Sequence, residues 1–91
     1  MKLLEVVEST EKCTEAGWFA YDFHMDEPLA SDTILLFRSF GNFLYLTMLK
    51  EPFYKIESDY YIIKGIEGKD FFRVAAHQDY CSIVDQVKSL F

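Results

Sequence analysis

The sequence predicts an α+β domain: an antiparallel sheet of about five or six strands, a C-terminal amphipathic helix and a short helix near residues 31–40. Three observations carry this prediction. Short runs rich in β-branched and aromatic residues are separated by turn residues, and two such runs flank a glycine turn at residues 68–69. The last twelve residues place apolar side chains at helical spacing. Because neither a repeat nor a linker is recognisable, we expect residues 1–91 to form a single domain.

The N-terminal part contains two predicted strands with a polar stretch between them. Met1–Glu8 includes β-branched valines and is interpreted as the first strand, with a short helix as the alternative. Ser9–Ala16 is polar and is expected to be a loop or a helical turn. Within Trp18–His24, every second residue from position 19 onward is aromatic, and the residues between them are more mixed in character. This alternation is typical of a strand with one strongly apolar face.

A turn and a short helix are predicted next. Met25–Ala30 contains a proline and acidic residues that favour a turn. Either Ser31 or Asp32 can cap a helix that ends just before Gly41. A strand at Thr33–Phe37 is the alternative, because short apolar runs do not distinguish the two.

Four strands are predicted in the second half of the chain. Asn42–Leu49 is rich in aromatic and aliphatic residues and is ended by Pro52. Phe53–Ser58 follows, with a turn at Ser58-Asp59. The last two strands are Tyr60–Ile66 and Phe71–His77. Between them, Gly68-Lys69 suits a two-residue type II′ hairpin, in which glycine comes first.

The C-terminal segment has the clearest helical pattern. Its apolar residues recur at intervals of three and four: Tyr80, Ile83, Val84, Val87 and Phe91. Asp79 is positioned to cap this helix.

The hairpin turn fixes a register, and the register divides the side chains between two faces. It pairs Gly65 with Phe72 and Lys64 with Arg73, and the remaining pairs follow by alternation. One face is coherently apolar and is expected to form the core under the C-terminal helix. Its members are Tyr54, Ile56, Tyr61, Ile63, Phe72, Val74 and Ala76.

The opposite face mixes charges with large apolar side chains, which are candidates for an interface. These are Phe53, Tyr60, Ile62, Ile66 and Phe71. Three explanations remain open: the helix near residues 31–40 covers this face, a second copy of the chain covers it, or it binds a ligand or another partner.

Lys64 and Arg73 are predicted to lie side by side on this second face. Like charges directly opposite one another on a hairpin are destabilising, so a compensating group is expected. Glu57 on the adjacent strand is one candidate. The alternative is an anion site in which Lys64 and Arg73 hold a phosphate or carboxylate, assisted by His77 or Lys55.

The charge and the apolar runs of the sequence argue against nucleic acid and membranes as partners. The chain has a net charge of −6, and eight acids against two lysines place that charge in residues 1–32. An acidic chain is a poor match for nucleic acid. No apolar run approaches the length that spans a bilayer. An acid at Glu5 interrupts what a signal peptide would continue as an apolar run, so a cytoplasmic location is expected.

Histidines and cysteines do not form a recognisable catalytic or metal-binding motif. His24 lies near carboxylates, but His77 is far away in sequence, and no metal site is predicted. Cys13 and Cys81 are expected to be free thiols, since no Cys-x-x-Cys motif is present. We therefore predict neither catalytic residues nor a cofactor.

The sequence thus favours a non-catalytic protein-interaction or self-associating module. Apolar residues make up 51% of a chain of only 91 residues, and a domain of this size has few fully buried positions. The expected partner is a second copy or another protein. The alternative is a regulatory domain that binds a small anionic ligand through Lys64 and Arg73.

Overall fold

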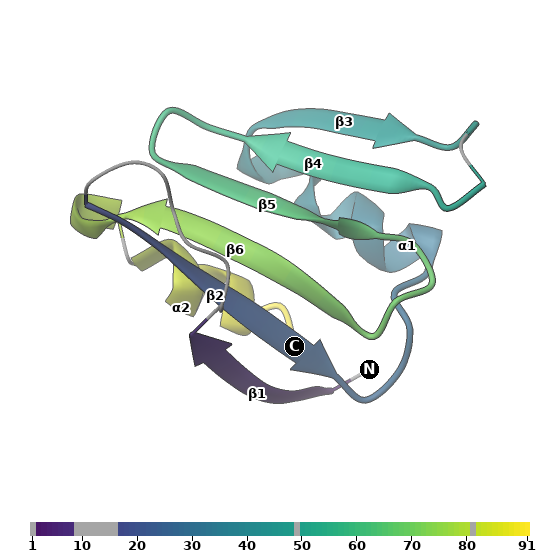
Figure 1. The fold of residues 1–91 in the computed structure, drawn as a ribbon, viewed down its shortest axis with the longest axis horizontal. Coiled ribbons are helices and arrows are strands. Elements are labelled where there is room, and N and C mark those ends of the chain that lie inside the picture. The colour runs from purple at the N-terminus through teal and green to yellow at the C-terminus, as the bar shows by residue number, and fades with distance from the viewer. Residues whose placement is uncertain (1, 9–16, 49, 81) are drawn as a thin grey trace.

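Six antiparallel strands form one sheet in the computed structural model, which describes residues 2–8, 17–48, 50–80 and 82–91. The strands are β1 (Leu3–Glu8), β2 (Trp18–Met25), β3 (Asn42–Leu46), β4 (Phe53–Glu57), β5 (Tyr61–Ile66) and β6 (Phe71–His77). Their order across the sheet is β1-β2-β6-β5-β4-β3 (Figure 1). The chain therefore builds the β3–β6 meander from one edge inward and brings β2 against the last strand. The predicted α+β class is confirmed.

Two short helical segments accompany the sheet. Residues 31–40 form α1 (Ser31–Ile34), which continues directly into the 3-10 helix η1 (Leu35–Phe40). After β6 come the 3-10 turn η2 (Gln78–Tyr80) and the C-terminal helix α2 (Ser82–Lys88). Both predicted helices are confirmed.

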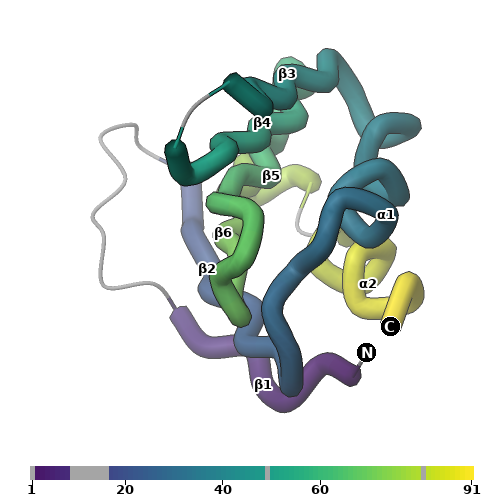
Figure 2. Tube along the Cα trace, turned by 90° about the vertical axis from the view of Figure 1, so that its right-hand side faces the viewer, coloured from purple at the N-terminus to yellow at the C-terminus, as the bar shows by residue number. Residues whose placement is uncertain are grey.

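Both helices pack on the same face of the sheet (Figure 2). Their buried side chains Ile34, Phe37, Ile83 and Val87 belong to one cluster with the inward-facing residues of β2, β4, β5 and β6. Phe37 is central, because its ring lies 5.1 Å from that of Phe72 and 6.3 Å from that of Tyr54. The hypothesis that the helix near residues 31–40 covers the second face of the sheet is therefore wrong.

The register predicted for the last hairpin is confirmed. Gly65 pairs with Phe72, Lys64 with Arg73 and Tyr61 with Ala76. The turn itself differs from the prediction. The amide of Lys69 donates to the carbonyl of Ile66, so Gly68 is the third residue of the turn and not the second. Gly68 takes φ +89°, a conformation that favours glycine.

The preceding turn is displaced by one residue from its predicted position. The amide of Ser58 donates to the carbonyl of Tyr61, so the turn centres on Asp59-Tyr60 and not on Ser58-Asp59. This moves the pairing of β4 with β5 by two residues, and Ile56 pairs with Ile63. Because a shift of two preserves the face of every side chain, the predicted core face remains correct.

Several predicted boundaries are wrong. The strand from Asn42 ends at Leu46, because residues 47 and 48 already form a turn. Neither Ser31 nor Asp32 caps α1: Ala30 stands at that position, and its carbonyl accepts the amide hydrogens of residues 33 and 34. At the C-terminus, Asp79 lies within η2, and α2 begins only at Ser82.

Tyr54 is a fully buried tyrosine on the helix-covered face. Its side chain lies across Gly65 of the neighbouring strand, where a Cβ atom would overlap the phenol. Its hydroxyl has no hydrogen-bond partner among the described residues. Burial raises the pKa of Tyr54 well above its ordinary value of 10.0. The hydroxyl therefore carries a desolvation penalty without a compensating hydrogen bond.

We expect Tyr54→Phe to leave the free energy of unfolding at neutral pH unchanged or to raise it by up to about 2 kcal/mol. Because the pKa of Tyr54 is raised in the folded state, this residue's contribution to the stability of the wild type is fully present below pH 10 and decreases as pH rises above it. The wild type should therefore lose stability above pH 10 more steeply than Tyr54→Phe, by up to about 1.4 kcal/mol per pH unit. Urea denaturation across this pH range measures both effects. Parallel curves would show that the hydroxyl is not desolvated, and a clear loss of stability at neutral pH would show that it has a hydrogen-bond partner.

Candidate functional site

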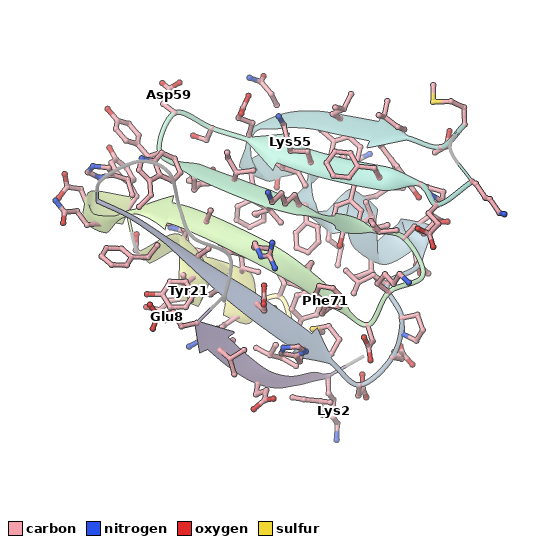
Figure 3. All side chains as sticks on the ribbon, viewed as in Figure 1. Lys2, Glu8, Tyr21, Lys55, Asp59 and Phe71 are labelled. Carbon is pink, nitrogen blue, oxygen red and sulfur yellow. The ribbon has the colours of Figure 1, made fainter. Side chains whose placement is uncertain are left out.

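The face opposite the helices is the candidate site, and we call it the open face. It comprises Glu5 and Val7 of β1, Trp18, Ala20, Asp22 and His24 of β2, Asn42, Leu44 and Leu46 of β3, Phe53, Lys55 and Glu57 of β4, Ile62, Lys64 and Ile66 of β5, and Phe71, Arg73, Ala75 and His77 of β6. Figure 3 shows the side chains seen from this side, with Lys55 and Phe71 labelled. Neither α1–η1 nor α2 packs on it.

Three bases lie next to one another across the middle of the open face. Lys55 pairs with Lys64, and Lys64 pairs with Arg73, so these residues of β4, β5 and β6 form one row perpendicular to the strands. Asp22 of β2 continues the row beyond Arg73. We call these four residues the basic row. Directly opposed side chains have Cβ atoms about 5 Å apart, so a single extended anion can reach several of the bases.

Arg73 is held in place by an ion pair with Asp22. Its Nε donates to Oδ1 of Asp22 at 2.8 Å, and both side chains are partly buried. From the sequence, Glu57 is the candidate for the acid that compensates Lys64 and Arg73. Instead, Asp22 contacts Arg73, and Glu57 lies 3.5 Å from Lys55. The reason is the pairing of β2 with β6, which brings a distant part of the sequence beside Arg73.

Apolar side chains flank the basic row on the side of the 67–70 turn. Phe53 pairs with Ile66 across β4 and β5. Phe71 lies beside His24, with their rings stacked at 6.0 Å, and it remains 39% exposed. On the other side of the row, Ile62 pairs with Ala75. Four of the five predicted interface residues therefore lie on the open face, around the bases.

His77 lies at one end of the open face, away from the basic row, and Tyr60 lies beside it in the turn between β4 and β5, outside this face. His77 is four residues from Arg73 along β6, which corresponds to about 13 Å. Its ring contacts those of Trp18 and Tyr60 at 6.2 and 6.3 Å, and its Nδ1 accepts the amide hydrogen of Asp79. The structure thus groups Lys55, Lys64 and Arg73 but places His77 in a separate aromatic cluster.

Tyr80 belongs to this aromatic cluster and not to the core. It was predicted to lie on the buried stripe of the C-terminal helix. Instead, its ring stacks on that of Tyr60 at 4.1 Å, and both rings are nearly half exposed. The early 3-10 turn of η2 precedes α2, so Tyr80 does not share the helical periodicity of Ile83 and Val87.

The other chemical candidates from the sequence do not gather into a site among the described residues. His24 stacks on Phe71, and no group of three or more potential metal ligands occurs in the described part of the chain. Cys13 and Cys81, together with the polar stretch 9–16, lie outside the described residues.

Sequence reasoning missed three residues of the open face that the structure makes prominent. In the sequence, Asp22 is only one of the carboxylates near His24, and no pattern distinguishes Val7 or Leu44. Val7 and Leu44 stand at opposite ends of the basic row and are 37% and 43% exposed. The alternation in residues 18–24 was the one signal that placed Asp22 on the side opposite the apolar aromatics.

The fold and site define a small α+β domain with a six-stranded antiparallel sheet that carries its helices on one face. No protein-family model, no curated protein and no solved structure matches the chain. In the described residues, no helix combines the length and the apolar character needed to cross a membrane.

Proposed function

We propose that this domain is a non-catalytic protein-interaction module and that the open face is its binding surface. The observation that carries the proposal is the packing of both helices on the other face. The open face consequently presents a row of bases with exposed or half-buried apolar side chains on either side. A protein interface commonly combines these two features, apolar anchors and charges that orient the partner.

The chemistry of this face favours a partner segment that alternates acidic and apolar side chains. Three bases and one acid form the basic row, although the chain as a whole has a net charge of −6. An extended acidic segment would place carboxylates over the row and apolar side chains against Phe53, Ile66 and Phe71. A face-to-face pair of identical copies is less favourable, because it would add a second row of the same composition to the interface.

A small anion is the second candidate, and the same row supports it. Lys64 and Arg73 are directly opposed, and an arginine whose guanidinium is already oriented by Asp22 is suited to hold a carboxylate or phosphate. This alternative needs the bases but not the apolar side chains around them. The two candidates can therefore be separated by comparing ligands that carry both acidic and apolar groups with ligands that carry acidic groups alone.

The test is a nuclear magnetic resonance titration of the labelled domain with a synthetic peptide of alternating glutamate and leucine. We expect shifts concentrated on β4, β5 and β6, and affinity about two- to fivefold weaker in Lys64→Ala, the factor that one exposed ion pair contributes. Lys88→Ala is the matched control, because Lys88 is exposed on α2, which packs on the other face. It should bind like the wild type.

Two comparison ligands complete this experiment. A peptide of alternating glutamate and serine tests the apolar contribution, and citrate tests the free anion. Binding of citrate as tight as that of the leucine peptide would favour the small-anion alternative. Shifts that spread over the helix-covered face, or equal losses in Lys64→Ala and Lys88→Ala, would contradict both candidates.

A further inference from the structure

β3 forms one edge of the sheet and is unusually unprotected. Its five residues pair only with β4 among the described strands, in a continuous register from Asn42↔Glu57 to Leu46↔Phe53. The strand contains neither a charged residue nor a proline, and Leu44 at its centre is 43% exposed. Charged residues, prolines and bulges are the usual means by which an edge strand avoids pairing with another chain.

The opposite edge, β1, has two of these protections. Glu5 and Glu8 are both exposed on it. Its register with β2 shifts between Leu3 and Glu5, which is the irregularity of a β-bulge. One edge of this sheet is thus protected against pairing, and the other is not.

The distribution of charge also favours contact at β3. Eight of the fifteen acids lie in residues 1–32, which include β1 and β2. β1 and β3 are separated by five strand spacings, about 24 Å across the sheet. Charges that far apart are strongly screened at physiological ionic strength, where the Debye length is about 8 Å. Two copies can therefore approach through β3 while their acidic halves remain far apart.

We propose that two copies of this chain associate by antiparallel pairing of their β3 strands, centred on Leu44. This register places Leu44 beside the partner subunit's Leu44 on the open face. It also places Phe43 opposite Tyr45 of the partner subunit on the other face. Aliphatic and aromatic cross-strand pairs of this kind stabilise antiparallel sheets. The contact joins two six-stranded sheets into one continuous sheet.

The association closes at two copies, because the pairing is isologous and each copy has one unprotected edge. Five residues per strand give a small interface, so the dimer is weak and depends on concentration. This inference uses an edge and not the open face, and it does not depend on the proposed function.

Light scattering across about 10 µM to 1 mM tests the inference. The wild type should rise from 10.7 kDa toward twice that mass, and amide exchange in β3 should slow as the concentration rises. Leu44→Lys introduces an edge charge at an exposed position and should remain monomeric throughout. Val7→Lys is the matched control, because Val7 is an exposed aliphatic residue on the open face at the opposite edge, and it should dimerise like the wild type.

Lys64→Ala separates edge pairing from association through the open face. It weakens the peptide binding proposed above but should dimerise like the wild type. A wild type that stays monomeric up to about 1 mM would overturn edge pairing. So would dimerisation of Leu44→Lys, or loss of the dimer in Val7→Lys or Lys64→Ala.

Discussion

Phe37→Ala should lower the free energy of unfolding by about 3–5 kcal/mol, the cost of deleting a fully buried aromatic side chain. Phe37 packs the 31–40 segment against the sheet, because its ring lies among those of Tyr54, Phe72 and Phe91. The cavity would open between η1, the sheet and the C-terminus. Urea denaturation followed by circular dichroism measures the loss.

Leu36→Ala is the matched control for this substitution. Leu36 is the preceding residue of the same 3-10 helix and is 50% exposed, so its truncation should cost less than about 1 kcal/mol. Similar losses in the two variants would mean that η1 does not present Phe37 to the sheet. That outcome would reopen the hypothesis that this segment covers the other face.

Gly65→Ala should destabilise the domain by about 2–3 kcal/mol. A Cβ atom at this position would overlap the hydroxyl and Cζ of Tyr54, and Tyr54 is fully buried. Gly68→Ala provides the comparison, because nothing lies within 4 Å of its Cβ position and the substitution encounters only the positive φ. That conformation alone costs about 1–2 kcal/mol.

A double-mutant cycle identifies the cause of the Gly65 effect. Tyr54→Leu removes the ring that lies over Gly65, so Gly65→Ala in that background should cost less than about 1 kcal/mol. Thermal and urea denaturation of the four proteins measure the coupling. If Gly65→Ala cost the same in both backgrounds, the close approach of Tyr54 would not explain why glycine stands here.

The local parts of this fold were predictable because short-range physical rules determine them. Gly68 marked the turn between β5 and β6, and once the turn was placed, alternation assigned every side chain of the hairpin to a face. An error of one residue in the Asp59-Tyr60 turn did no harm, because it shifted the register by an even number. The helix after residue 81 followed from the spacing of Ile83 and Val87.

The order of the strands was not predictable in the same way. β2 reaches β6 across more than forty residues of chain, and no turn residue or pattern records that pairing. The face chosen by residues 31–40 depends on the space that Phe37 fills between Tyr54 and Phe72, which is a property of the assembled core. The alternation of side chains within one segment indicates neither which strand will pair with it nor which face of the sheet a helix will cover.

In the candidate site, too, the local contacts were predictable and the contacts between distant segments were not. The opposition of Lys64 and Arg73 followed from the hairpin. The next turn predicted only the face of Lys55, because the predicted turn paired Lys55 with Ile62 and not with Lys64. Asp22 was missed as the partner of Arg73 because that ion pair requires the contact between β2 and β6. His77 was grouped with the bases because it shares their face, but its distance along β6 places it with Trp18 and Tyr60.

In this structure both helices pack on one face of the sheet, and neither of them packs on the open face. Relaxation enhancement by a soluble paramagnetic gadolinium chelate tests it directly on the wild-type side chains. We predict strong broadening for Leu44 and Phe71 on the open face and little for Ile56 and Ile63 beneath the helices. Equal protection of the two pairs would show that the open face is covered in solution and would contradict this arrangement.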